Sequence, residues 1–151
     1  MESISERAVR SFLEAREIPY QRNYNLPQLR HRKYDFFFTY QKRPCLLEWD
    51  GIHHFEEVPH FDTRGNTLVA RQEADRLKTR LALEYGFYLI RLDHTCIDSI
   101  TSHLLLALQR IKTKTHYFSN PFYYTHLNLG VNKGTVIREC EELARKMKLI
   151  P

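Results

Sequence analysis

The sequence contains few cysteines and no long apolar run, and these absences narrow the class of protein. Cys45, Cys96 and Cys140 are odd in number and lie far apart, unlike the paired framework of a disulfide-stabilised secreted domain. No stretch of 18 apolar residues suggests a membrane-spanning helix. The opening segment, MESISERAVRSFLEAR, is charged and lacks an apolar signal core. We therefore expect an intracellular protein with reduced cysteines, neither secreted nor membrane-bound.

Internal repeats and low-complexity tracts are also lacking. The chain has 151 residues, of which 42% are hydrophobic and 13% aromatic. That length and composition predict one globular domain with a packed core. The net charge is +5, which is compatible with a polyanionic partner without requiring one.

The hydrophobic and turn patterns predict an α/β protein. The expected elements are a helix over 3–17, strands over 34–40 and 45–50, a helix over 71–85, a strand over 87–92 and a helix over 97–112. Residues 20–33 are expected to form a basic, polar connection. The order predicts a mixed central β-sheet with flanking helices, in an α-β-β-α-β-α core over residues 1–112. Residues 113–151 would form a helical C-terminal extension.

Each of the two later helices shows an apolar stripe. In the helix over 71–85 the stripe expected to face the sheet consists of Ala74, Leu77 and Leu81. Asp75 and Lys78 would lie at its edge, and an ordinary salt bridge along the helix is one explanation for them. The apolar face expected in the helix over 97–112 consists of Ile97, Ile100, Leu104, Leu105 and Leu108.

Three carboxylates are expected to gather on the predicted hairpin. Alternation along a strand puts Glu48 and Asp50 on one face. If Gln41 and Lys42 form a two-residue turn, Asp35 lies directly across from Glu48. Such a cluster would be costly without a cation and suits a hard ion such as Mg²⁺. A solvent-facing polar side of the hairpin, paired with nearby basic residues, is the competing explanation.

Histidines follow the second strand of this hairpin. Gly51 allows a sharp turn that could bring His54 back over the acidic residues. An imidazole that titrates near neutral pH is a suitable proton acceptor there. A zinc site would find donors in the histidines at 53, 54, 60 and 94 and in Cys96, but no C-x₂-C or H-x₃-H pair supports one.

Taken together, the segments YDFFF, CLLEWDGIHHF and RQEADRLKTRLALEYGFYLIRL resemble a nuclease family. The resemblance is to the Vsr-like branch of the PD-(D/E)XK superfamily, in particular the small phage and viral homing-endonuclease-like enzymes with an EDxHD motif. It implies a restriction-endonuclease-like core and a metal-dependent DNA endonuclease that uses Mg²⁺, with Mn²⁺ able to substitute. The superfamily's E-x-K motif requires lysine at position 50, where this chain has Asp50, so His54 and Lys78 are expected to take over its role.

The resemblance also implies a role for each matching residue. Asp35 would be the central metal ligand, completed by Asp50 with Glu48 nearby. His54 would be the general base, Glu6 would hold metal-bound water, and Asp75 and Lys78 would be supporting polar residues. The basic residues expected to contact DNA phosphates are Arg22, Arg30, Arg32, Lys33, Lys42 and Arg43.

Two questions stay open at the level of sequence. The first is whether the chain cuts duplex or structured DNA, or is a catalytically inactive nucleic-acid-binding or viral accessory protein that retains the nuclease fold. The second concerns residues 124–150, which resemble the second half of a helix-turn-helix but also suit a helix that packs on the core or on a partner. A homodimer is left open.

Overall fold

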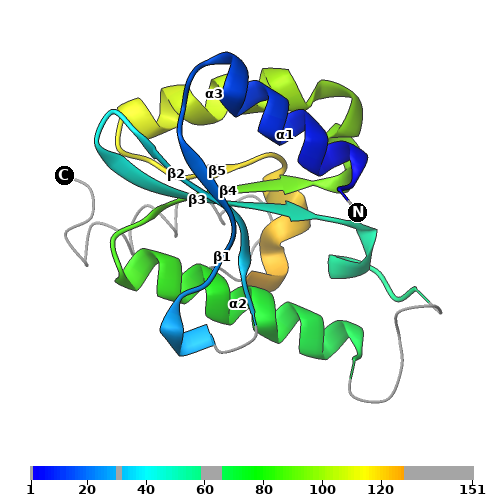
Figure 1. Cartoon of the computed structure of the whole chain (residues 1–151). Coiled ribbons are helices and arrows are strands. Elements are labelled where there is room, and N and C mark those ends of the chain that lie inside the picture. Colours follow the sequence, from blue (N-terminus) through cyan, green and yellow to red (C-terminus); the bar gives the residue numbers. More distant parts are fainter. Residues whose placement is uncertain (1, 30–31, 59–65, 128–151) are drawn as a thin grey trace.

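A five-stranded mixed sheet forms the centre of the fold in the computed structural model, which describes residues 2–29, 32–58 and 66–127 (Figure 1). The strands are β1 (Tyr20–Tyr24), β2 (Tyr34–Tyr40), β3 (Arg43–Asp50), β4 (Tyr88–Asp93) and β5 (Tyr117–Phe118). They lie in the order β1-β2-β3-β4-β5. The first three are antiparallel, whereas β3, β4 and β5 run parallel. The coarse prediction of a mixed sheet with flanking helices is confirmed.

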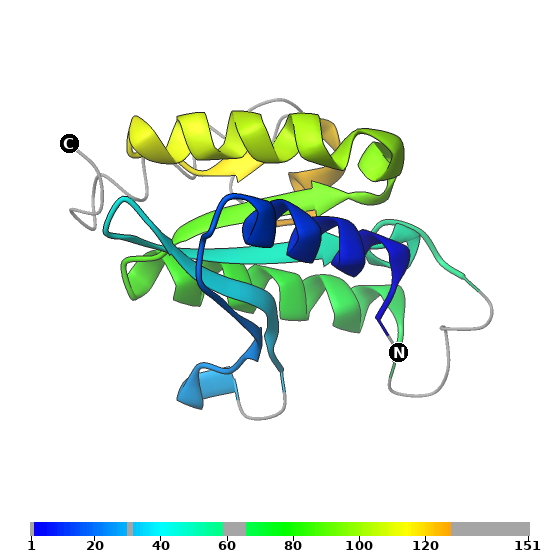
Figure 2. The ribbon, with the colours of Figure 1, turned by 45° about the horizontal axis from the view of Figure 1, so that its top comes forward.

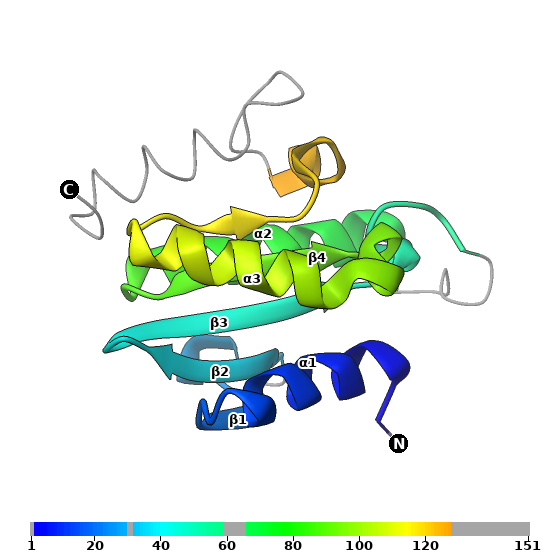
Figure 3. The same ribbon diagram turned by 90° about the horizontal axis from the view of Figure 1, so that it is seen from above.

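Helices cover both faces of this sheet. The helices are α1 (Ile4–Ala15), α2 (Leu68–Glu84) and α3 (Ile100–Lys112), with short 3₁₀ segments η1 (Pro27–Leu29), η2 (Ile52–His54), η3 (His94–Ser99) and η4 (Pro121–Leu127). Figure 2 shows α1 and α3 on one face and α2 on the other. Seen from above, α1 lies over β1 and β2, and α3 lies over β4 (Figure 3). The sheet therefore has an apolar cluster on each side.

Local sequence signals explain several of the element boundaries. The Ser3 hydroxyl accepts a hydrogen bond from the backbone N–H of Glu6 and caps α1. The N-cap of α2 is Thr67, so the helix begins three residues before the predicted start. Gln41 and Lys42 have φ angles of 48° and 64° and form the two-residue turn between β2 and β3. The predicted hairpin register is therefore confirmed.

The basic connection predicted over residues 20–33 is wrong for its first part, because β1 is a strand there. Its tyrosines and Arg22 alternate with the exposed Gln21 and Asn23. As the edge of the sheet, β1 needs only one half-buried face, so its apolar signal is weak. The pairing of Arg22 with Phe36 places this arginine on the sheet.

The prediction for the buried face of α2 is correct for Leu81, which packs against an apolar cluster, but wrong for Leu77. Leu77 is exposed, whereas the residues of α2 that are buried are Asp75, Lys78, Thr79, Ala82 and Leu83. The polar stripe of this helix faces the sheet because the strands beneath it carry buried charges that need partners. On α3, Ile100, Leu104 and Leu108 are buried as predicted. Ile97 and Leu105 are exposed.

Residues 117–127 belong to the same layered structure. β5 adds a strand beside β4, and Tyr124 and Leu127 of η4 are buried in the apolar cluster that contains Leu89. The predicted final helix and helix-turn-helix, beyond residue 127, lie outside the described residues. Cys45 and Cys96 are free and buried, as expected. Within the described ranges, no helix is both long and apolar enough to cross a membrane.

His116, just before β5, is completely buried and acts as a hydrogen-bond acceptor. Its Nδ1 accepts from the backbone N–H of Leu89 at 3.0 Å, and its Nε2 has no partner among the described residues. The ring must therefore be neutral, with its proton on Nε2. Burial lowers the pKa of His116 to about 4. Protonation of Nδ1 would remove the bond to Leu89 and leave a buried charge.

Acid conditions should destabilise the protein through His116. A pKa lowered from 6.5 to about 4 gives stability that is complete above pH 6.5 and is lost as the pH falls towards 4. Between pH 7.5 and pH 5 this residue alone should remove about 2 kcal/mol from the free energy of unfolding. His116→Gln keeps an acceptor but does not titrate. Its free energy of unfolding, measured with urea, should therefore fall by about 2 kcal/mol less than that of the wild type between pH 7.5 and pH 5. His103→Gln, on α3, is the control. An identical pH dependence of His116→Gln and the wild type would contradict the assignment.

Candidate functional site

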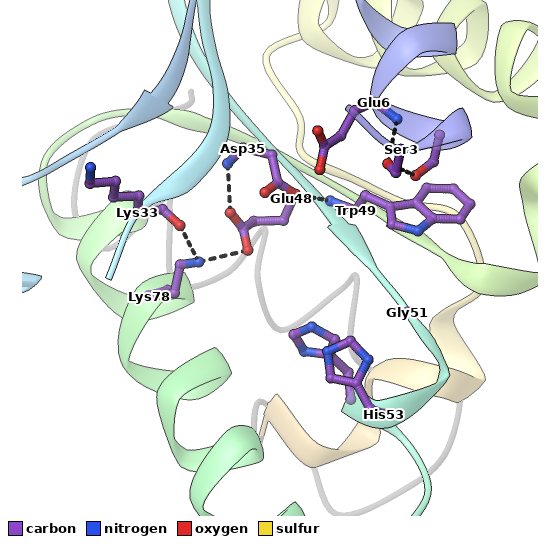
Figure 4. Close-up of a pocket in the computed structure, with 11 residues that line it drawn as sticks. Ser3, Glu6, Lys33, Asp35, Glu48, Trp49, Gly51, His53 and Lys78 are labelled. Atoms are coloured by element: carbon purple, nitrogen blue, oxygen red, sulfur yellow. Dashed lines mark hydrogen bonds and ion pairs between the residues drawn. The ribbon is translucent and has the colours of Figure 1, made fainter. Parts of the chain in front are cut away.

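An open cavity of about 430 Å³ lies where β2 and β3 separate, beside the first turn of α1 (Figure 4). It is lined by Ser3, Ser5, Glu6, Lys33, Asp35, Glu48, Trp49, Gly51, His53, His54 and Lys78. These residues come from α1, β2, β3, η2 and α2. Six predicted site residues therefore share this cavity: Glu6, Lys33, Asp35, Glu48, His54 and Lys78.

Carboxylates replace the backbone ladder at this separation. The last regular pair between β2 and β3 is Phe36 with Leu47. Beyond it, the backbone N–H of Asp35 donates to Glu48 Oε1 at 2.9 Å, and the N–H of Trp49 donates to Asp35 Oδ2 at 2.7 Å. The side chains thus satisfy backbone groups that the strands no longer pair. Both carboxylates are held at the floor of the cavity.

Lys78 brings a positive charge to this floor from α2. Its Nζ donates to Glu48 Oε2 at 2.7 Å and to the backbone oxygen of Lys33 at 2.7 Å. The hydroxyl of Tyr34 donates to the carbonyl of Lys78, which fixes the helix over the strand. The partners of Lys78 thus lie outside its helix, which excludes an ordinary salt bridge along α2.

The cavity floor carries more negative than positive charge. Burial and the neighbouring Glu48 raise the pKa of Asp35 to about 7, although the N–H of Trp49 and the ammonium of Lys78 oppose this. Asp35 Oδ1 has no hydrogen-bond partner within the described part of the chain. A cation placed beside this oxygen would relieve the repulsion between the two carboxylates.

Glu6 faces the cavity from the first turn of α1, and Arg22 holds it there. The Arg22 guanidinium donates to Glu6 Oε2 and to Glu2 Oε2, the latter at 2.8 Å. Because both of its terminal nitrogens bond carboxylates, Arg22 is engaged within the protein. This arrangement does not suit the predicted contact of Arg22 with DNA.

A buried ion cluster lies between β3, β4 and α2. Arg91 is completely buried, and its Nη1 donates to Asp50 Oδ1 and Oδ2 at 2.8 and 2.9 Å. The same nitrogen lies 3.7 Å from Asp75 Oδ1. Tyr124 donates to Asp50 Oδ2 at 3.0 Å. Burial disfavours the charged guanidinium, but Asp50 and Asp75 outweigh it, so the pKa of Arg91 is raised.

His54 links this cluster to the cavity. Its Nδ1 lies 3.0 and 2.9 Å from the two carboxylate oxygens of Asp75. Burial lowers the pKa of His54, but the hydrogen bond that His54 donates to Asp75 and the charge of Asp50 outweigh that effect and raise it. A proton held on Nδ1 leaves Nε2 as the basic nitrogen, and no described residue bonds it.

The backbone of η2 is held from α2. Arg71 Nε donates to the carbonyl of His53 at 2.7 Å, and Gln72 Nε2 donates to that of His54 at 3.1 Å. Gly51 begins this turn, where a side chain would meet the His53 ring at 3.1 Å. These contacts set the position of His54 at the end of β3.

The predicted metal trio does not converge. Glu48 and Asp35 line the cavity, but Asp50 is buried against Arg91 and Tyr124. Among the described residues, a different group of three could hold a metal ion. Its members are Asp50, His54 and Asp75, whose ligand atoms lie within 4.8 Å of one another. These distances would allow a metal ion. However, the guanidinium of Arg91 already balances the charge of Asp50.

The remaining predicted DNA contacts are scattered. Lys33 lines the cavity and Arg32 is exposed beside it, whereas Arg30 lies outside the described residues. Lys42 and Arg43 are at the hairpin turn, about 20 Å from Asp35 at the usual rise of a strand. The described members of this set therefore do not form one patch at the cavity, and their contact with DNA phosphates stays a prediction.

Sequence reasoning missed Arg91, Tyr124 and His126. His126 Nε2 lies 3.0 Å from Asp75 Oδ2, so it belongs to the buried cluster. A signal for Arg91 was present in the strand FYLIRL, where one arginine interrupts a continuous apolar run. Tyr124 and His126 had no comparable signal, because only the folding of η4 onto α2 brings them to the site.

Loss of Arg91 should destabilise the protein strongly. Arg91→Met removes the partner of two buried carboxylates, and breaking such a pair typically costs about 3–5 kcal/mol. Urea unfolding should show this loss, whereas the exposed Arg80→Met on α2 should leave the free energy of unfolding nearly unchanged. A loss in Arg91→Met as small as that in Arg80→Met would contradict the role of this ion cluster.

No protein-family model matches the chain, and neither the curated proteins nor the solved structures compared with it include a match. The resemblance carried by the segments around Asp35, Glu48 and His54 therefore stays a prediction. What the site can do follows from its own side chains and their geometry.

Proposed function

We propose that the chain is a metal-dependent endonuclease that hydrolyses phosphodiester bonds in DNA. The observation that carries this proposal is one cavity that joins three kinds of group. Asp35 and Glu48 supply paired carboxylates, Lys78 an ammonium, and His54 an imidazole whose Nδ1 is occupied by Asp75. Hydrolysis of a phosphodiester needs a cation at the phosphate, a base for water and neutralisation of the developing charge.

The chemistry of the floor suits Mg²⁺ or Mn²⁺. Asp35 and Glu48 present hard carboxylate oxygens from adjacent strands, and Asp35 Oδ1 has no hydrogen-bond partner within the described residues. Glu6, across the cavity, offers a further carboxylate to metal-bound water. A divalent ion bound there would stabilise charge on the phosphate and lower the pKa of a bound water. The proposed ligands are Asp35 and Glu48 because both line the cavity, whereas Asp50 does not and bonds Arg91.

His54 and Lys78 would carry the rest of the reaction. With its proton held on Nδ1 by Asp75, His54 can accept a proton from water at Nε2. Lys78 already bonds Glu48, so its ammonium lies beside the carboxylates and can neutralise charge on the phosphate. Asp50 contacts Arg91 and does not line the cavity. Lys78 of α2 would supply the positive charge that the lysine of an E-x-K motif supplies from a strand.

The topology is compatible with the same proposal but is not specific to nucleases. An antiparallel β1-β2-β3 unit precedes α2, and β4 then runs parallel to β3. That order is compatible with the nuclease core that the sequence resemblance implies. The net charge of +5 suits a nucleic-acid substrate.

Cleavage of plasmid DNA with Mg²⁺ or Mn²⁺ tests the proposal. Asp35→Asn keeps the acceptor for Trp49 but removes the charge, and His54→Gln removes the base. Each should lower the cleavage rate about 100-fold or more. Lys112→Ala, an exposed position at the end of α3, is the control and should retain the rate. Cleavage that survives in Asp35→Asn would refute this site, and tight DNA binding without any cleavage would favour the inactive binding protein.

Metal binding can be measured separately from cleavage. At Mn²⁺ concentrations about tenfold above the dissociation constant, binding should stabilise the fold by about 1.4 kcal/mol and raise the melting temperature by about 3–5 °C. Asp35→Asn should abolish this increase and EDTA should reverse it. If the increase persists in Asp35→Asn but disappears in Asp75→Asn, the ion binds at Asp50, His54 and Asp75 instead.

A further inference from the structure

The segment η4 inserts two polar side chains into the buried ion cluster. Tyr124 donates to Asp50, and His126 Nε2 lies 3.0 Å from Asp75 Oδ2. Arg76 of α2 donates to the carbonyl of His126 at 2.7 Å and fixes the backbone there. The His126 side chain is only 7% exposed. This contact therefore belongs to the interior and not to a solvated surface.

The partners of His126 determine its protonation state. Its Nδ1 lies 3.2 Å from the carbonyl oxygen of Tyr123, and its Nε2 faces the carboxylate of Asp75. A carbonyl and an ionised carboxylate can only accept, so each ring nitrogen faces a hydrogen-bond acceptor. Asp75 is ionised because Arg91 lies beside it. The ring of His126 is therefore placed between two acceptors, an arrangement that a doubly protonated imidazole would satisfy at both nitrogens.

An imidazolium at position 126 would also balance the charge of the buried ion cluster. Asp50 and Asp75 bring two negative charges, and Arg91 and His126 bring two positive charges. With this balance His54 can stay neutral, as a general base must be before it accepts a proton. Without His126 the cluster would carry a net negative charge beside the His54 ring and would favour its protonated form.

We infer that His126 is a positioning residue that holds Asp75 through a charged hydrogen bond and thereby fixes and tunes His54. Both histidines contact the same oxygen, since His54 Nδ1 and His126 Nε2 lie 2.9 and 3.0 Å from Asp75 Oδ2. This inference rests on the proposed function of His54 as the base. It makes η4, beyond the predicted core over residues 1–112, part of the catalytic machinery.

Charged and titratable groups of the described residues surround His54 from three elements and from its own turn. They are Asp75 of α2, Asp50 of β3, Arg91 of β4 and the neighbouring His53. His126 acts on His54 through Asp75, and its own ring packs on Phe55 and Tyr124. Replacement by glutamine retains an N–H donor for Asp75 but removes the positive charge. His126→Gln therefore separates the charge from the hydrogen bond.

Nitrogen-15 NMR of the histidine rings tests this inference without reference to cleavage. In the wild-type protein at pH 7.5, both ring nitrogens of His126 should be protonated, and His54 should carry its proton on Nδ1. In His126→Gln, the titration midpoint of His54 should rise by about 0.5–1 pH unit. His103→Gln, whose ring contacts Tyr117 away from the cluster, should leave the midpoint unchanged. A neutral His126 in the wild type, or an unmoved His54 midpoint in His126→Gln, would overturn the inference.

A pH profile of plasmid cleavage connects the two proposals. If His54 is the base, the acid limb of the profile should move upwards in His126→Gln by the same amount as the NMR midpoint. Cleavage that requires His54 but keeps its acid limb in His126→Gln would overturn the inference and leave the function standing. A moved NMR midpoint in a protein that does not cleave DNA would uphold the coupling of His126 to His54 and refute the proposed function.

Discussion

The ion pair between Arg91 and Asp50 is the constraint on which the rest of the structure depends. Arg91 lies in a strand whose residues are all buried, and a guanidinium there is tolerated only if acceptors surround it. β3 supplies Asp50, α2 supplies Asp75 and η4 supplies Tyr124 to the same cluster. The polar face of α2 must therefore pack on the sheet, which sets the position of Lys78 over Glu48.

A second constraint acts where β2 and β3 separate. Once the strands part, the N–H groups of Asp35 and Trp49 need acceptors, and the carboxylates of Glu48 and Asp35 provide them. The same bonds gather negative charge at the floor of the cavity. The structural and chemical roles of these side chains are thus inseparable, because the geometry that satisfies the backbone also creates a site attractive to a cation.

Much of the fold could be predicted because its signals are local. The turn at Gln41 and Lys42 follows from the lengths of the two aromatic and apolar strands, and that turn puts Asp35 opposite Glu48. The edge strand β1 was harder to predict than β2 and β3, since two of its five residues are exposed and its apolar signal is weak. The stripe of Ala74, Leu77 and Leu81 misled the prediction for α2, because periodicity reports where apolar residues lie and not which buried charges need partners.

By itself, the sequence determined the three helices, the strands β2, β3 and β4, the hairpin register and the presence of Asp35, Glu48, His54 and Lys78 as candidates for one site. Tertiary structure alone decided which carboxylates remain in the cavity. Asp50 and Glu48 project from the same strand. However, Asp50 bonds the buried Arg91, whereas Glu48 bonds Lys78 at the floor of the cavity. It also decided that His126 reaches Asp75. Partners 41 and 51 residues apart are brought together by the packing of whole layers, which no local pattern encodes.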